Sequence, residues 1–361
     1  MITFNLWEII KIGLEGDGPV YEQIHKTLRH FEDPGVEDLD LTITTLPTIA
    51  SPLTAELLGA PNDYYKKTEN NFSIVKYGDS ISVNKDFTKI KASSTAPVDL
   101  VRLLMEWRIR QELLIEGYSM IHASGVVYND TSIIFPAWRH TGKTNTMLTF
   151  LKEGGSFLAD DRLVIGSNGT VLGYPTDLHL LSYNYRSFPE IVPRSLISKL
   201  RSVVSHNLNG MTSQRSSIFS KGLNLINNTV IAENHWFPVH QVFPESDTIS
   251  QTALDKIVLL RTTTRDEAYV VPIDVSELSA ALGAINYREW DQSLLEIGLS
   301  HKSLTGNKSF EKSVQSIIKN QRNIFENIPK TVDLYKLHIP KQEYWTPATR
   351  ENIFNKVIEA S

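Results

Sequence analysis

The fold is decided by residues 131–165, which read TSIIFPAWRHTGKTNTMLTFLKEGGSFLADDRLVI. Residues 131–135 are a short, β-rich apolar run, which predicts a strand. After a polar loop, apolar residues recur at helical spacing and predict a helix from about Gly142 to Glu153. Residues 156–165 read as a further strand, interrupted by two aspartates. A strand, a loop, a helix and a strand in this order predict the core of an α/β domain.

The loop between the first strand and the helix carries a motif. Residues 137–144 fit the pattern G-x-x-x-x-G-K-[ST] at every position except the first. A loop of this kind cradles phosphates, because its backbone N–H groups point inward and the helix start adds a partial positive charge. In this pattern Lys143 reaches the β- and γ-phosphate oxygens, the Thr144 hydroxyl is a ligand of Mg²⁺, and Gly142 lets the backbone approach the phosphate closely.

The motif therefore predicts a site for ATP, or another nucleoside triphosphate, with Mg²⁺. The residues predicted to bind it are Arg139, His140, Thr141, Gly142, Lys143, Thr144 and Asn145. The alternative is a plain helix start with an exposed lysine.

Three loop residues depart from the usual pattern. Ala137 replaces the first glycine, which the turn tolerates if the φ angle of Ala137 is negative. Arg139 and His140 stand where a small Ser-Gly pair is typical. Arg139 can add a cationic phosphate contact, but a bulky loop can also narrow the site.

Two aspartates, Asp160 and Asp161, interrupt the second strand. Burying carboxylates is costly unless a metal, a cation or a hydrogen-bond network compensates. Successive strand residues point to opposite faces, so the two carboxylates have different roles unless the strand ends there. We assign Asp160 to Mg²⁺ support and expect one of the pair to accept the proton of an attacking hydroxyl. The alternative is a strand that ends in a solvated turn.

The order of these segments resembles a known family. Residues 121–127 (IHASGVV), 133–136 and 151–165 are similar to the HPr kinase/phosphorylase catalytic domain, which has a histidine-containing strand, a phosphate loop and an Asp-Asp strand at the same spacing. The resemblance covers roughly residues 118–175. It implies the phosphoenolpyruvate-carboxykinase-like variety of P-loop fold, ATP and Mg²⁺, and phosphate transfer to a serine or other hydroxyl.

Roles carry over from this resemblance by position. Lys143 and Thr144 take the nucleotide and the metal, Asp160 and Asp161 supply metal support and the base, and His122 is a supporting residue near the phosphates. No segment resembles the one that binds the HPr carrier protein. We therefore expect a divergent relative, of the kind that includes kinases of free serine and of ribosomally made peptides.

The predicted fold class is α/β, α+β overall. We expect a small N-terminal α+β domain at residues 1–95, a P-loop catalytic domain at residues 96–275 and a mainly helical region at residues 276–361. Further predicted elements are a strand at 40–44, a hairpin at 71–83, a helix from about 97 to 116, and strands at 118–127, 171–174, 256–261 and 269–271. Residues 191–234, rich in Ser and Asn, read as a mobile lid or as a variable surface insertion.

Composition narrows the class of protein. The net charge of −5 argues against a general nucleic-acid binder. The chain has no cysteine, which excludes disulfides, thiolate metal sites and a cysteine nucleophile, and fits a reducing compartment. No signal-peptide pattern or membrane-spanning apolar run is present, so we expect a cytoplasmic protein. The expected partners are a nucleotide and a hydroxyl-bearing peptide, protein or small molecule, and a homo-oligomer remains open.

Other residues are weaker candidates. Arg261 lies at the end of a predicted strand and is the favoured arginine for stabilising the transferring phosphoryl group, ahead of Arg265. The alternative is that both are exposed turn residues, which is the commoner situation for an arginine. His235 and His240 can bind substrate, although packed loop histidines are the simpler interpretation.

Two further clusters have plain explanations. The basic residues Lys302, Lys308, Lys312, Lys319 and Arg322 read as a solvated helix face, or as a surface that receives an acidic or phosphorylated substrate. Tyr344 and Trp345 read as an anchor that docks the C-terminal segment.

Three functions are consistent with these residues. The first is an ATP- and Mg²⁺-dependent kinase that acts on a hydroxyl. The second is a nucleotide-binding regulator or scaffold without catalysis, which the altered loop favours. The third is a phosphorylase or phosphatase that uses the same site in reverse.

Overall fold

The computed structural model describes residues 1–49, 56–60, 62–67, 71–191 and 235–360. The protein is a mixed α/β, α+β structure with several sheets and helices. It divides into two compact units, and each is built from three segments of the chain. Unit 1 comprises 1–122, 164–172 and 274–330, and unit 2 comprises 123–163, 173–273 and 331–361. The predicted lid at 191–234 lies outside the described residues, apart from Ile191.

These units differ from the three consecutive domains expected at 1–95, 96–275 and 276–361. Residues 274–330 belong to unit 1 together with the N-terminal residues, whereas residues 331–361 belong to unit 2. The difference has a physical reason: helices far apart in the sequence bury their apolar faces in one core, and sequence periodicity does not reveal which core that is.

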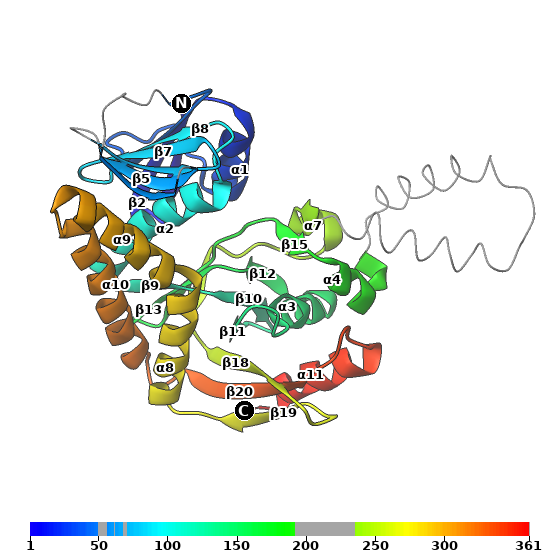
Figure 1. Ribbon diagram of the computed structural model, residues 1–361. Helices are drawn as coiled ribbons and strands as arrows, with labels where there is room; N and C mark the ends of the chain where they lie inside the picture. Colours follow the sequence, from blue (N-terminus) through cyan, green and yellow to red (C-terminus); the bar gives the residue numbers. More distant parts are fainter. Residues whose placement is uncertain (50–55, 61, 68–70, 192–234, 361) are drawn as a thin grey trace, which may run out of the picture. The chain divides into compact units, whose positions relative to one another are not determined.

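The largest sheet lies in unit 1 and has eight strands in the order β1-β2-β3-β8-β7-β6-β5-β4. Its strands run from blue to cyan in Figure 1: β1 (Ile2–Leu6), β2 (Ile10–Glu15), β3 (Leu41–Leu46), β4 (Glu56–Ala60), β5 (Asp63–Lys67), β6 (Asn71–Lys76), β7 (Asp79–Asn84) and β8 (Lys89–Ser93). The predicted hairpin is confirmed as β6 and β7, which join at Tyr77 and Gly78 with φ angles of 55° and 91°. Positive φ at both positions matches the twist of a tight hairpin.

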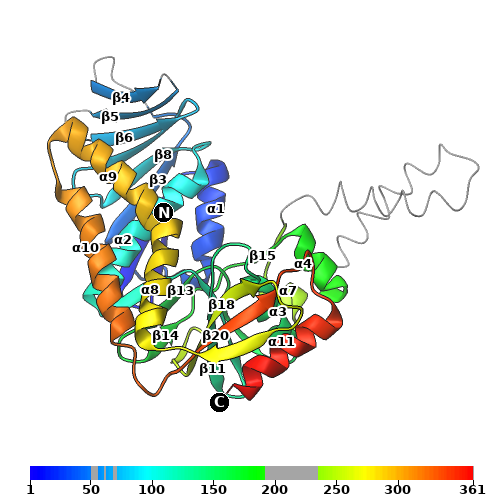
Figure 2. The ribbon, with the colours of Figure 1, turned by 60° about the horizontal axis from the view of Figure 1, so that its bottom comes forward.

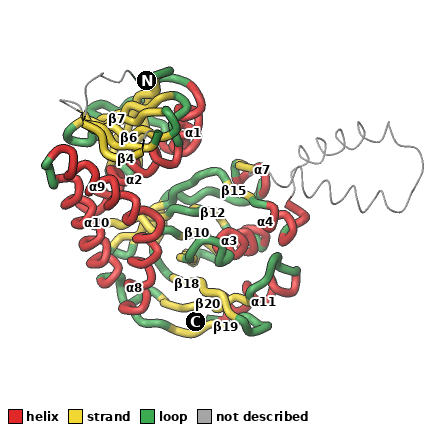
Figure 3. Tube along the Cα trace, in the orientation of Figure 1, coloured by secondary structure: helices red, strands yellow, loops and turns green. Residues whose placement is uncertain are grey.

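The helices of unit 1 are α1 (Gly18–Leu28), the 3₁₀ turn η1 (Arg29–Phe31), α2 (Val98–Ile115), α8 (Val275–Asn286), the π-helix η3 (Tyr287–Asp291), α9 (Gln292–Thr305) and α10 (Ser309–Glu326), shown as red coils in Figure 3. Helix α2 confirms the prediction for residues 97–116. Unit 1 also holds β9 (Tyr118–Ile121), β14 (Thr170–Leu172) and β13 (Leu163–Gly166) from Val164 onward.

The sheet of unit 2 has six strands in the order β12-β10-β11-β18-β20-β19. They are β10 (Ala123–Tyr128), β11 (Thr131–Pro136), β12 (Ser156–Ala159), β18 (Lys256–Thr263), β19 (Tyr269–Pro272) and β20 (Asp333–Pro340). Strands β11, β18 and β20 are parallel, and the others pair antiparallel. The carboxyl ends of the parallel strands therefore lie at one edge of this sheet.

Residues 276–361 are mainly helical, as expected, but they also contain strand β20, which was not predicted. It lies between β18 and β19, inside the sheet. Its sequence, DLYKLHIP, alternates only weakly and follows a long helix, so its periodicity does not mark it as a strand. Strands β18 and β19 confirm the predictions at 256–261 and 269–271.

Two apolar runs that were each predicted as one strand are in fact two. Residues 118–127 form β9 and β10, and residues 156–165 form β12 and β13. The chain passes between the units at residues 122–123 and 163–164. Both halves of each run are apolar and buried, so period alone cannot locate the break.

The remaining elements of unit 2 are α3 (Lys143–Lys152), β15 (Leu178–Leu180), α4 (Ser182–Ser187), the turn η2 (Pro189–Ile191), β16 (His235–Phe237), α7 (Val239–Val242), β17 (Gln251–Ala253) and α11 (Pro347–Glu359). Figure 2 shows α11, in red, beside α3 and β20. The ring centroids of Phe150 on α3 and Phe354 on α11 are 4.9 Å apart. Each fully buried aromatic side chain of this core contributes about 1.5–3 kcal/mol to folding.

Candidate functional site

The site begins where strand β11 leads into helix α3. Ala137 is fully buried and does not have a positive φ, which meets the condition for an alanine at the first motif position. Residues 138–140 are exposed at the tip of the loop. Helix α3 then begins at Lys143 and is preceded by Gly142, whose φ is 109°.

Gly142 is required for a reason that the motif does not contain. A Cβ atom added to Gly142 would lie 2.7 Å from Cζ2 of Trp345. Trp345 is 5% exposed and belongs to the core of unit 2. The indole therefore packs directly against the loop backbone, and Trp345 is the anchor that was expected near residue 344.

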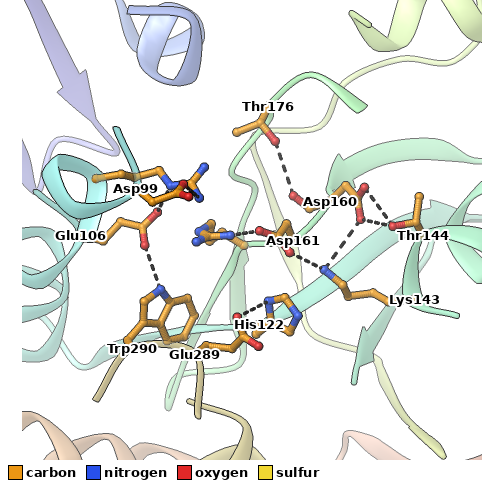
Figure 4. A network of polar contacts seen from close by, with 12 residues as sticks. Asp99, Glu106, His122, Lys143, Thr144, Asp160, Asp161, Thr176, Glu289 and Trp290 are labelled. Carbon is orange, nitrogen blue, oxygen red and sulfur yellow. Dashed lines mark hydrogen bonds and ion pairs between the residues drawn. The ribbon is translucent and has the colours of Figure 1, made fainter. Parts of the chain in front are cut away.

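The Asp pair lies between two strands rather than within one. Strand β12 ends at Ala159, and Asp161 has a φ of 80°, in the left-handed region. Because the strand ends there, the two side chains are not forced to opposite faces. Nζ of Lys143 lies 2.9 Å from Oδ1 of Asp161 and 4.0 Å from Oδ1 of Asp160. Figure 4 shows the lysine directed toward both carboxylates.

Asp160 is the buried member of the pair. It is 4% exposed, and the Thr144 hydroxyl donates to its two carboxylate oxygens at 3.1 and 3.2 Å. Burial raises the pKa of Asp160, although Lys143, the Thr144 hydrogen bond and Arg162 each act to lower it. The Thr176 hydroxyl contacts the backbone oxygen of Asp160 at 3.4 Å (Figure 4).

Asp161 differs from Asp160 in exposure. Its side chain is 46% exposed, so solvent reaches a carboxylate that is also held by the lysine. The two carboxylates therefore occupy one buried and one open position beside the same cation.

Two residues of this site were missed from the sequence. Arg162, whose side chain is 10% exposed, forms an ion pair between Nη1 and Oδ2 of Asp161. Burial raises the pKa of Tyr183 on α4, and the charge of Asp160 raises it further. A cation directly after two aspartates was a usable signal for Arg162, whereas Tyr183 carried none.

Thr144 and Asp160 have the chemistry for Mg²⁺. Among the described ranges, no group of three or more His, Asp or Glu side chains could hold a metal by itself. Mg²⁺ does not require one, because it keeps several waters and is commonly held by one or two protein oxygens together with substrate phosphates. A hydroxyl and a carboxylate already in contact fit that kind of site.

Asn145, a predicted cofactor ligand, has both ends of its amide engaged elsewhere. Its Nδ2 donates to the Ser187 hydroxyl at 3.2 Å, and its Oδ1 accepts from Nδ2 of Asn184 at 2.7 Å. The Ser187 hydroxyl also accepts the backbone N–H of Trp345 at 2.9 Å. The side chain of Asn145 therefore faces helix α4.

His122 is the last residue of unit 1 before the chain enters unit 2. It is 2% exposed, and its Nδ1 lies 3.9 Å from Oε2 of Glu289 in the π-helix. The neighbouring Trp290 donates from Nε1 to Glu106 at 2.8 Å, a contact visible in Figure 4. The buried Asp291 accepts from Arg110 at 2.7 Å and so holds the same turn of helix.

Arg261 lies in β18, in register with His338 of β20. Strand β18 is parallel to β11, with Ile257 level with Ile134. Arg261 therefore lies toward the carboxyl edge of the sheet, from which the β11–α3 loop leaves. This placement is compatible with the predicted role.

The remaining candidates lie on other elements. Arg265 is exposed and stacks on the Tyr269 ring at 4.5 Å, as a turn arginine does. His240 is exposed on α7, and His235 lies in β16. The basic residues of α9 and α10 line exposed or half-buried helix faces, where Lys302 pairs with Glu311 and Arg322 with Glu326 at 2.9 and 2.8 Å, so they form a solvated face.

Comparison with models of protein families finds no match for this chain, and comparison with curated proteins finds none either. In the described part of the chain, no helix is both long enough and apolar enough to cross a membrane.

Proposed function

We propose that this protein is a P-loop kinase of the HPr-kinase-like kind, which binds ATP with Mg²⁺ and transfers the γ-phosphate to a hydroxyl acceptor. One observation carries the proposal: Lys143 and Thr144 contact the Asp pair that follows them in the chain, at 2.9 Å to Asp161 and 3.1 Å to Asp160. A helix-start lysine and threonine facing two carboxylates provide the groups that phosphoryl transfer needs.

Exposure assigns the two carboxylates. Asp161, 46% exposed, is open to an incoming acceptor and is the proposed base, whereas the buried Asp160 and Thr144 are the proposed metal ligands. The acceptor proton passes to Asp161 as the acceptor oxygen bonds to the γ-phosphorus. The bond from that phosphorus to the bridging oxygen breaks, and ADP leaves with the electron pair. Lys143 balances charge on the transferring group, and bound Mg²⁺ supplies further neutralisation.

The first test replaces Lys143 with alanine and measures Mg·ATP binding by calorimetry. We expect binding to weaken about 10- to 100-fold, since a hydrogen bond to a charged group contributes about 1.5–3 kcal/mol. Lys152→Ala is the matched control, because Lys152 lies on the same helix and is 42% exposed. Equal binding by both variants and the unaltered protein would sink the proposed nucleotide site.

The second test replaces Asp161 with asparagine and measures phosphate transfer from Mg·ATP to water, free serine and serine-containing peptides. A general base contributes roughly 10²–10⁴-fold, so transfer should fall by that factor while Mg·ATP binding persists. Asp266→Asn, at an exposed turn of unit 2, is the control. Undiminished transfer by Asp161→Asn would rule out this mechanism.

A second candidate function follows from the exposed tip of the loop. Trp138 is 38% exposed, and Arg139 and His140 are also exposed, so the proposed phosphate loop carries three bulky side chains open to solvent. A regulator that binds nucleotide without transferring phosphate would bind Mg·ATP in the first test and transfer nothing in the second. Release of phosphate or pyrophosphate from a phosphoserine substrate would instead reveal the reverse reaction at the same site.

A further inference from the structure

Asp161 is held at two points. Its Oδ1 accepts from Nζ of Lys143 at 2.9 Å, and its Oδ2 pairs with Nη1 of Arg162. The two cations each bind a different oxygen of the Asp161 carboxylate. Together they fix its orientation, although the side chain is 46% exposed. An exposed carboxylate without such contacts samples several rotamers.

The two cations are not equivalent in the proposed reaction. Lys143 lies at the helix start, where the motif directs it to phosphate, so its contact with Asp161 competes with substrate. Arg162 directly follows Asp161 in the chain, and its side chain is 10% exposed, more buried than the carboxylate that it holds. The ion pair between Arg162 and Asp161 can therefore persist when Lys143 leaves Asp161 to bind phosphate.

Charge balance supports the same division. Lys143, at the start of α3, and Arg162 pair with Asp160 and Asp161, which precede Arg162 in the turn after β12. Two positive side chains therefore lie beside two carboxylates. Arg162 also acts on Asp160, whose burial is costly without nearby cations. A planar guanidinium suits this task because it fixes a carboxylate in direction as well as in charge.

We infer that Arg162 is a positioning residue, which keeps the carboxylate of Asp161 aimed at the acceptor while Lys143 binds phosphate. This inference rests on the proposed function, and it adds a residue that the motif does not contain. Arg162 acts through Asp161 and does not contact the phosphate.

The experiment is a double-mutant cycle on Mg·ATP hydrolysis, with water as the acceptor. Arg162→Gln should lower kcat about a hundredfold, the loss expected when a reacting group is displaced by about 1 Å. The KM for Mg·ATP and its affinity by calorimetry should stay within about threefold, because the nucleotide contacts are intact. Arg162→Lys, which keeps the charge but loses the planar fork, should recover at least about tenfold of the lost kcat.

The second mutation separates positioning from other roles. If Arg162 acts through Asp161, adding Arg162→Gln to Asp161→Asn should lower kcat no further. Arg265→Gln, at an exposed turn of unit 2, should leave kcat unchanged. Should Arg162→Gln fail to fold, the cycle is run with Arg162→Lys, whose smaller loss should likewise vanish beside Asp161→Asn.

The outcomes distinguish this inference from the proposed function. The role of Arg162 is overturned if the kcat losses of the two single variants multiply in the double variant. It is also overturned if Arg162→Gln loses Mg·ATP affinity and kcat by the same factor. Either result leaves the kinase proposal standing. Unaltered protein that neither binds Mg·ATP nor releases phosphate overturns both.

Discussion

Two residues with left-handed backbone conformations frame the candidate site. Gly142 has a φ of 109° and Asp161 has a φ of 80°. The first starts helix α3, so that Lys143 is its first residue, and the second lets the chain turn directly after a buried strand. Local backbone geometry, more than side-chain length, therefore brings the lysine and the carboxylates together.

Replacing Gly142 with alanine tests this geometry. The new Cβ would meet Cζ2 of Trp345 at 2.7 Å in a backbone conformation that is strained for alanine, so we expect a loss of about 2–4 kcal/mol of unfolding free energy. Chemical denaturation measures it. Gly154→Ala is the control, because Gly154 also has a positive φ, 91°, but has nothing within 4 Å of the added atom. An equal loss for both variants would show that the Trp345 contact costs nothing.

Asn145 provides a second test at this scale. In Asn145→Ala, Nδ2 of Asn184 loses the acceptor that it reaches at 2.7 Å, and a buried unsatisfied group costs about 1–3 kcal/mol. Unfolding free energy should fall by that amount while Mg·ATP affinity, corrected for the fraction folded, stays the same. A loss of affinity without a loss of stability would instead support the ligand role that the motif predicts.

Much of the candidate site could be predicted from single residues. The spacing from Lys143 to Asp160 and Asp161 indicated one cluster, and their contacts agree with it. The partners of Asn145 could not be predicted, because Ser187 and Asn184 come from a helix with no motif. Tyr183 was missed for the same reason: contacts across the chain leave no periodic signal.

At the scale of elements, helix α11 is tied down at its C-terminal end by a buried lysine. Nζ of Lys256, in β18, donates to the backbone oxygens of Ala360 at 2.6 Å and Val357 at 3.3 Å. Cations at this end of a helix satisfy its last carbonyls and oppose its dipole. Burial lowers the pKa of Lys256, and the nearby charge of Asp333 only partly offsets that shift.

Lys256→Met should therefore loosen α11 while keeping the packing of the aliphatic stem. We expect a loss of about 1–3 kcal/mol of unfolding free energy, the range for hydrogen bonds from a charged donor, together with faster amide exchange at residues 353–359. Lys341→Met, at an exposed position, is the control. Unchanged exchange in α11 would contradict the capping role.

Some helices and strands could be recognised from the sequence, and others could not. Helices α2 and α3 and the β6–β7 hairpin have strong periodicity or a clear turn, and their predictions are confirmed. Strand β20 was missed because it forms within a polar, helix-rich stretch, and its pairing with β18 and β19 supplies the stability that its own sequence does not indicate.

At the scale of the whole molecule, stability should depend on pH through His301 in unit 1. The imidazole is 4% exposed and packs at 5.1 Å from Phe72 and 5.5 Å from Phe87, between ring centroids. Burial lowers the pKa of His301, although a hydrogen bond with the backbone of Asn307 partly opposes this. The unfolded chain, with a pKa of about 6.5, then binds a proton more readily than the folded protein.

Because of this difference in pKa, the free energy of unfolding should decrease as the pH falls. The contribution of His301 is complete above about pH 6.5 and is lost as pH falls toward the lower folded pKa. Unfolding free energies of the unaltered protein and of His301→Gln, measured from pH 8 to pH 5, should therefore converge as the pH falls. A difference that stays constant over this range would contradict the prediction. His30→Gln, at an exposed position outside this aromatic cluster, is the control.

The discontinuous make-up of unit 2 has a consequence for its biosynthesis. Strand β11 ends at residue 136, but β20 begins only at residue 333, and Trp345, which supports Gly142, follows it. A ribosome adding about 5–20 residues per second takes roughly ten seconds or more to cover that interval. In the last part of that interval, after β18 is complete at residue 263, one edge of β18 still lacks its partner β20, and such open edges invite pairing with other chains. A nascent chain stalled before residue 345 would lack the indole beneath Gly142, so the loop should acquire its final support only late in translation.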